Sequence, residues 1–148
     1  MSEKTFATIT NILPPIPCHW SVGVYLERFY VDLAEKQFTG IKCKKCKKVY
    51  VPPRKFCCGQ EMEQFVKVKD TGVLTNYTVA YQKVNGARRE TPIIIGLVTL
   101  DGASTAVWGE IKVDPPTVVE IGMRVKAVFA DKPGLMVESL SHFRALKK

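Results

Sequence analysis

Four of the five cysteines in this 148-residue chain lie in one short segment, IKCKKCKKVYVPPRKFCCGQ, residues 41–60. Cys43 and Cys46 form a CxxC pair, and Cys57 with Cys58 forms a second pair after a basic turn that contains two prolines. Two pairs of thiolates are what a tetrahedral structural zinc requires. The segment therefore predicts a zinc ribbon in which these four cysteines hold one Zn²⁺.

The second pair departs from the usual pattern, because its cysteines are adjacent and followed by Gly59, without the two-residue spacer of a CxxC. Adjacent ligands strain the turn, so one of them could be idle, with Cys18 or His19 as a substitute fourth ligand. A redox CxxC is the alternative, although no βαβ pattern surrounds it. Catalytic zinc is disfavoured, since four sulfur ligands leave no open position for water.

Cysteine usage and the N-terminus indicate the compartment. An odd number of cysteines, mostly in one cluster, fits a reducing environment where thiols serve metals more often than disulfides. The N-terminus MSEKTFATIT lacks the charged-then-apolar pattern of a signal peptide, and no run of eighteen apolar residues occurs. We expect a soluble, cytoplasmic protein without a membrane span.

The formal net charge of +8 points to an anionic partner, which could be nucleic acid, a phosphorylated cofactor or an acidic protein surface. The positive charge is concentrated in the cysteine segment, whereas residues 91–111 contain no Lys or Arg. Arg54 and Lys55, beside the proline turn, are the candidates for phosphate contacts. The basic residues of the segment are Lys42, Lys44, Lys45, Lys47, Lys48, Arg54 and Lys55.

The N-terminal part divides into an extended arm, residues 1–20, and a helix, residues 21–40. Three prolines punctuate the arm, and apolar residues recur at helical spacing in the helix. This stripe either packs on its own chain or presents an aromatic face to a partner, with Tyr25, Phe29 and Tyr30 as candidate anchors. The stripe comprises Val22, Tyr25, Leu26, Phe29, Tyr30 and Leu33.

After the ribbon, which we place at residues 41–64, the pattern of residues 65–148 becomes β. Five short apolar runs, separated by Gly, Pro and Asn turns, suggest a small barrel or sandwich, of which the OB-fold is the five-stranded option. The fold class expected is mainly β. The runs are VLTNYTVAYQ, TPIIIGLVTL, ASTAVWGEI, RVKAVFA and GLMVESL.

An OB-fold often binds single-stranded nucleic acid through stacked aromatics and a basic groove. Tyr77, Tyr81 and Trp108 are available for stacking, and Tyr77 and Trp108 are our candidate ligand contacts. The second and third expected strands carry no basic residue, so nucleic acid is disfavoured. Core packing is the alternative role for these aromatics.

No catalytic motif is visible in the sequence. The two histidines, His19 and His142, lie near opposite ends of the chain, and there is no GxSxG, P-loop or GxGxxG pattern after a strand. Surface positions account for both histidines. We therefore do not expect an enzyme.

The order of these parts resembles a known family. A helix, a CxxC followed by PPR, a second cysteine pair and the segments IIIGLVTLDG and IGMRVKAVFADKPGL are similar to the family first catalogued as domain of unknown function thirty-five. The resemblance covers roughly residues 20–145. It implies a rubredoxin-like zinc ribbon followed by a C-terminal OB-fold, and the adjacent cysteines are where this chain departs from the family pattern.

The resemblance also implies a function. Members of the family are associated with thiolases and other acyl-CoA enzymes, and are thought to act as acyl-CoA-binding or scaffolding subunits; in archaea one is held between a thiolase and a hydroxymethylglutaryl-CoA synthase. We accordingly expect a non-catalytic subunit in lipid or isoprenoid (mevalonate) metabolism, docked through the 21–38 helix and the ribbon. The alternative is a nucleic-acid-binding adaptor.

Overall fold

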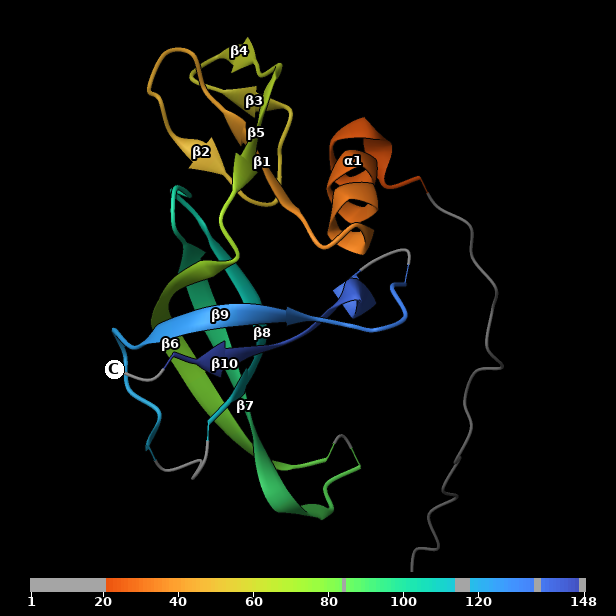
Figure 1. The fold of residues 1–148 in the computed structure, drawn as a ribbon, viewed down its shortest axis with the longest axis vertical. Helices are drawn as coiled ribbons and strands as arrows, with labels where there is room; N and C mark the ends of the chain where they lie inside the picture. The colour runs from red at the N-terminus through yellow and green to blue at the C-terminus, as the bar shows by residue number, and fades with distance from the viewer. Residues whose placement is uncertain (1–20, 84, 114–117, 135–136, 147–148) are drawn as a thin grey trace, which may run out of the picture.

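The computed structural model describes residues 21–83, 85–113, 118–134 and 137–146. The expected arm of residues 1–20, with Cys18 and His19, lies outside the described residues. Figure 1 shows a small cysteine-bearing ribbon at one end of the molecule, a barrel at the other end, and a single helix that lies beside the ribbon and above the barrel. Among the described residues, no helix is long and apolar enough to cross a membrane.

Helix α1 runs over Gly23–Ala34, so it is shorter than the expected 21–40. It ends in a Schellman arrangement, in which the Gln37 N–H donates to the Asp32 carbonyl at 2.9 Å and the Lys36 N–H donates to the Leu33 carbonyl at 3.0 Å. Lys36 has a φ of +61°, the left-handed value that stops a helix. The residues that follow are buried and form a strand.

The ribbon consists of two small sheets. In the first, β1 is the central strand and pairs antiparallel with β2 and β5; in the second, β3 pairs with β4. Gly40 in β1 has no room for a side chain, since a Cβ there would lie 2.9 Å from side-chain atoms of both Val49 and Val51. The ribbon strands are β1 (Phe38–Lys42), β2 (Val49–Tyr50), β3 (Phe56–Cys57), β4 (Gln60–Glu61) and β5 (Gln64–Val68).

The C-terminal strands close into a barrel in the order β10-β8-β7-β6-β9. Adjacent strands are antiparallel except β8 and β10, which are parallel. The expectation of a five-stranded barrel is confirmed. Its strands are β6 (Thr71–Gln82), β7 (Arg88–Leu100), β8 (Ala106–Lys112), β9 (Arg124–Phe129) and β10 (Leu140–Ala145), with a 3₁₀ helix, η2 (Val137–Ser139), before β10.

Two strands differ from their expected positions. The fifth was placed on GLMVESL, but residues 137–139 form η2 and the strand is β10, where buried Phe143 faces the barrel interior. The second, expected over residues 91–100, begins at Arg88 and includes Arg89, and the third, β8, ends at Lys112. The expectation that these two strands carry no basic residue was therefore wrong.

One hydrophobic core joins helix, ribbon and barrel. Phe29 and Leu33 of α1, with Phe38 and Val51 of the ribbon, belong to the same cluster as the barrel interior. The Phe38 ring lies between Phe29 and barrel residue Phe129, with centroid distances of 6.5 and 5.5 Å. The aromatic stripe of the helix therefore packs mainly on its own chain.

Hydrogen bonds reinforce this junction between ribbon and barrel. The Val49 N–H donates to the Ser104 hydroxyl at 3.1 Å, and the Ser104 N–H donates to the Val49 carbonyl at 2.7 Å. The Thr105 hydroxyl accepts from the Val51 N–H at 2.8 Å and donates to the Val51 carbonyl at 2.9 Å. The β7–β8 loop thus binds the backbone N–H and C=O groups of Val49 and Val51, the two residues that flank Tyr50.

We predict that Phe29→Ala lowers the free energy of unfolding by about 3–5 kcal/mol, because it removes a ring that is only 4% exposed from a core shared by all three parts. Urea denaturation followed by circular dichroism measures this. The matched control on the same helix is Val24→Ala, at a side chain 74% exposed, which should change stability by no more than about 0.5 kcal/mol. Equal effects of the two changes would contradict a shared core.

Candidate metal centre and binding surfaces

The structure brings the four cysteines of the ribbon together. The Sγ atoms of Cys43, Cys46, Cys57 and Cys58 all lie within 4.8 Å of one another. The distances from Cys57 Sγ to Cys46 Sγ and to Cys58 Sγ are both 3.6 Å. Sulfur ligands about 2.3 Å from one tetrahedral zinc lie ~3.8 Å apart, so the four thiols fit that ion without a fifth donor.

The first knuckle, residues 43–48, is formed by the CxxC pair. The Cys43 N–H donates to the Lys48 carbonyl and the Lys47 N–H donates to the Cys43 carbonyl, both at 2.9 Å. Lys47 has a left-handed φ of +61°, which turns the chain back toward β2. The backbone N–H groups of Cys46 and Lys45 point at the Cys43 sulfur and lower the pKa of that thiol.

The second knuckle, residues 57–60, is a two-residue hairpin turn between β3 and β4. Cys57 pairs with Gln60, and the two corner residues, Cys58 and Gly59, have φ values of +52° and +76°. Positive φ at both corners is typical of a type I′ turn. This turn allows adjacent cysteines to reach one cluster, which the missing spacer had put in doubt.

Tyr50 and Arg54 surround the buried sulfur of Cys57. The Tyr50 hydroxyl lies 3.1 Å from Cys57 Sγ, and this hydrogen bond lowers the pKa of Cys57 to about 6 and raises the pKa of Tyr50 to about 12. The Arg54 guanidinium carbon stands 3.8 Å above the centre of the Tyr50 ring. Arg54, expected to contact phosphate, therefore already has partners inside the ribbon.

The other basic residues of the ribbon differ in their availability. Lys55 lies 3.7 Å from a Glu61 carboxylate and 5.2 Å from the centre of the Phe56 ring. Lys44 forms an exposed ion pair with Glu63 at 3.0 Å. The first knuckle also carries exposed Lys45, Lys47 and Lys48, which form no ion pair within the described part of the chain. These three lysines are the more accessible cations.

The three expected partner anchors on the helix face inward to different degrees. Phe29 is a core residue, which corrects its assignment as an exposed anchor. The Tyr25 hydroxyl donates to Glu61 Oε1 at 2.7 Å and to the Met62 carbonyl at 3.2 Å, so Tyr25 ties the helix to the ribbon. Tyr30 is partly buried against the core. The periodicity that identified this stripe marks a buried face, not a free one.

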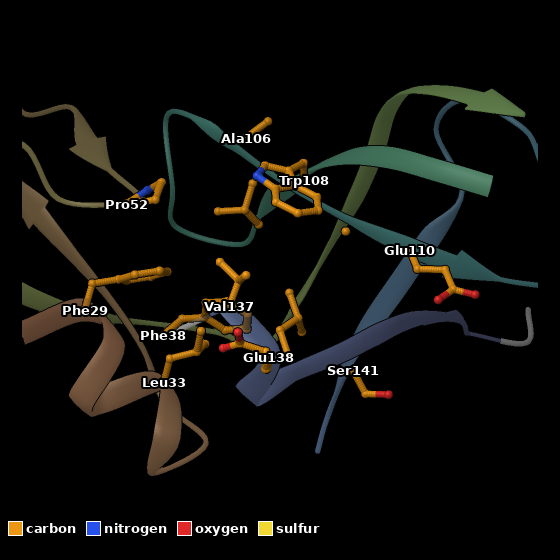
Figure 2. A pocket seen from close by; sticks show the side chains of 13 residues that line it. Phe29, Leu33, Phe38, Pro52, Ala106, Trp108, Glu110, Val137, Glu138 and Ser141 are labelled. Carbon is orange, nitrogen blue, oxygen red and sulfur yellow. The ribbon is translucent and has the colours of Figure 1, made fainter. Parts of the chain in front are cut away.

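A pocket of about 320 Å³ opens where the helix meets the barrel. Figure 2 shows Phe29, Leu33 and Phe38 on one side of it and the Trp108 side chain on the other. Glu110, Glu138 and Ser141 supply most of its polar groups. Its remaining lining residues are Pro52, Ala106, Val107, Gly109, Val137 and Leu140.

Trp108 also belongs to an exposed apolar face on the outside of the barrel, formed with Ile95 and Leu97. Trp108 is 62% exposed and lies opposite Leu97 in the register of β7 and β8. Tyr77, the other expected ligand contact, lines a second hollow beside the same three side chains. In the register of β6 and β7, however, Tyr77 lies opposite the inward-facing Gly96 and packs against the core. The expected pair Tyr77 and Trp108 is therefore not brought together on one face.

Ile95 and Leu97, which lie in the apolar run TPIIIGLVTL, were not singled out from the sequence. In β7 the burial alternates, with Ile94, Gly96 and Val98 inside and these two outside. The run of apolar residues could have indicated this, because a strand with one face in solvent needs apolar residues only on its buried face. Ile95 and Leu97 therefore add apolar surface to the outer face of the barrel beside Trp108.

Comparison with known proteins follows the same division into two parts. Residues 32–62 match the family described as "ChsH2, rubredoxin-like zinc ribbon domain", and residues 65–130 match "ChsH2, C-terminal OB-fold domain". A DUF35 domain-containing scaffold protein from Methanocaldococcus jannaschii is 31% identical over 93 residues. The match covers 61% of this chain and 65% of that relative, so the chain spans slightly less than two thirds of its length.

Two solved structures share the fold. A DUF35-family protein of unknown function from Sulfolobus solfataricus aligns with a TM-score of 0.63 and 24% identity, over 80% of this chain and 81% of the other. The Ltp2-ChsH2(DUF35) aldolase aligns with a TM-score of 0.65 and 21% identity, over 86% of this chain and 98% of the other. The expected helix, zinc ribbon and OB-fold are confirmed, and the four clustered cysteines agree with zinc as the metal.

We predict that the purified protein contains one equivalent of zinc and that Cys58→Ser removes most of it, because both adjacent thiols belong to the cluster. Metal analysis by mass spectrometry measures this, and chelation should melt the ribbon before the barrel. A zinc content unchanged by Cys58→Ser would show that this thiol is idle. Less than about half an equivalent of any metal in the unaltered protein would contradict the site.

Proposed function

Because this chain belongs to the DUF35 family of ChsH2-type zinc-ribbon and OB-fold proteins, we propose that it is a non-catalytic scaffold subunit of an acyl-CoA enzyme of the thiolase type. The relative from M. jannaschii is named as a scaffold protein, and one structural neighbour is a complex named as an aldolase. These names support a scaffold role beside an enzyme, and the thiolase type of that enzyme is what the family resemblance implies. The position of the enzyme-binding site is inferred from the surface of this chain.

The observation that carries the proposal is the apolar face of Ile95, Leu97 and Trp108 beside the 320 Å³ pocket. Exposed apolar clusters on a folded domain favour a protein partner, and tryptophan is among the commonest residues that dominate binding energy at interfaces. We therefore place the enzyme contact on this face and the pocket edge. The helix was expected to bind the partner, but its Phe29 side chain is buried in the internal core.

Acyl-CoA is the ligand that we propose for the assembled complex. The phosphates of coenzyme A suit the exposed lysines of the first knuckle, Lys45, Lys47 and Lys48, and its apolar arm suits the apolar face that includes Trp108. A pocket of 320 Å³ is at the lower end of the ~300–1,000 Å³ usual for ligand sites, so the chain alone holds at most part of such a ligand. The enzyme would supply the remaining contacts.

The specific partners follow from the family. We propose a thiolase, with a hydroxymethylglutaryl-CoA synthase as a second partner if the pathway is that of mevalonate. A nucleic-acid adaptor is the competing function, and one observation favours it: Arg88 and Arg89 extend β7 near exposed Tyr81. An aromatic residue beside arginines can stack and neutralise a single strand.

We predict that the tagged full chain, purified from native extract, brings down an acyl-CoA enzyme of the thiolase type, and that Trp108→Ala weakens this capture. The loss of an interface hot spot should cost at least about 2 kcal/mol, or roughly 30-fold in affinity. Tyr81→Ala is the matched control, since Tyr81 is a similarly exposed aromatic on β6 outside the apolar face. Recovery with ribosomes or RNA and no acyl-CoA enzyme would end the scaffold proposal.

We predict a second, separable result for the ligand: acyl-CoA binding to the complex should fall when Lys47→Glu and Lys48→Glu are combined. Calorimetric titration at two salt concentrations measures the electrostatic contribution, which salt weakens. The control combines Lys67→Glu with Lys69→Glu, two exposed lysines beyond the knuckles. Equal losses in both double variants would mean a diffuse charge effect and no site at the knuckle.

A further inference from the structure

The cysteine sulfur atoms of the two knuckles accept hydrogen bonds from different kinds of donor. In the first knuckle, the two-residue spacer turns the backbone N–H groups of Lys45 and Cys46 toward Cys43. In the second knuckle, Cys57 and Cys58 are adjacent and Cys57 pairs with Gln60 in a two-residue hairpin, and no backbone N–H group is among those that act most strongly on the Cys57 sulfur. The hydrogen bonds that act most strongly on Cys57 come instead from side chains, with that of Tyr50 first.

Tyr50 is placed to donate to the Cys57 sulfur. Its hydroxyl oxygen lies 3.1 Å from Cys57 Sγ, and a metal-bound thiolate has no proton of its own, so the hydroxyl must be the donor. Tyr50 is the last residue of β2, and both flanking residues, Val49 and Val51, are fixed by hydrogen bonds to the β7–β8 loop. The donor is therefore held by a rigid part of the fold.

Arg54 restrains Tyr50 from the other side of the ring. The guanidinium carbon is 3.8 Å from the ring centroid, well within the ~6 Å range of a cation–π contact. The guanidinium therefore restrains the ring whose hydroxyl lies against the Cys57 sulfur.

We propose that Tyr50 and Arg54 are positioning residues for the metal centre, and that they support the Cys57 sulfur through side chains, whereas the first knuckle uses backbone N–H groups. They do not bind the metal. They orient Cys57 Sγ toward it and offset the negative charge on the thiolate. The proposal concerns the ribbon alone and is independent of which enzyme or ligand the protein binds.

Two features of the sequence agree with these roles of Tyr50 and Arg54. The segment between the cysteine pairs, KKVYVPPRKF, contains one tyrosine and one arginine; the tyrosine contacts Cys57 and the arginine stacks on that tyrosine. The same contacts explain how two adjacent cysteines can hold the metal in place of a second CxxC pair. An outer hydrogen bond to a metal ligand typically changes metal affinity by about 10–100-fold.

The test compares Tyr50→Phe with Tyr25→Phe in the full chain. Both changes remove one hydroxyl and keep the ring, but the Tyr25 hydroxyl binds Glu61 and Met62 and not a cysteine. We expect Tyr50→Phe to weaken zinc binding by about 10–100-fold in competition with a chromophoric chelator, whereas Tyr25→Phe changes it by less than about threefold. Far-ultraviolet circular dichroism checks that both variants keep the barrel.

A second measurement separates positioning from loss of stability. In the cobalt-substituted protein, Tyr50→Phe should shift the sulfur-to-cobalt charge-transfer band, because a hydrogen bond to one ligand sulfur is lost; Tyr25→Phe should leave it in place. Arg54→Met should weaken zinc binding in the same direction, with the neighbouring change Lys55→Met as its control. Unchanged affinity and spectrum in Tyr50→Phe would overturn the proposal, as would a weaker affinity with an unshifted band.

Discussion

The attachment of β2 to the β7–β8 loop is the interaction on which the rest of the structure depends. Val49 and Val51 each exchange two hydrogen bonds with Ser104 or Thr105, and Val51 is also buried in the common core. Between them Tyr50 faces the cysteine cluster, and directly after them Pro52 lines the pocket. Metal centre, core and pocket therefore meet within four consecutive residues.

This arrangement ties the small ribbon to the core of the barrel. A module of this size has too little apolar surface to be stable alone, and such modules usually depend on their metal. Here Phe38 and Val51 extend the ribbon's core into that of the barrel, while Phe29 and Leu33 of the helix cover the join. Zinc then has a local task, the geometry of the two knuckles, because the barrel carries much of the remaining burial.

The distribution of charge separates two surfaces with different chemistry. Exposed lysines gather on the first knuckle at one end of the molecule (Figure 1), and the apolar face with Trp108 lies on the barrel, with Glu110 and Glu138 at the nearby pocket. A scaffold needs both kinds of surface if it is to hold a protein and attract an anionic ligand. The two need not compete, since they belong to different elements.

The sequence alone determined the parts of this protein that depend on local spacing. Paired cysteines predicted the metal cluster, the period of Phe29 and Leu33 predicted a helix with one apolar face, and alternation with turn residues predicted five strands. Only the tertiary structure decided which apolar residues are free. Whether Phe29 is buried and Leu97 exposed depends on which elements pack together, and spacing along the chain does not encode that. The adjacent cysteines mark the same boundary: their ability to share one cluster rests on a left-handed turn and on Tyr50, a partner seven residues away that folding brings to 3.1 Å.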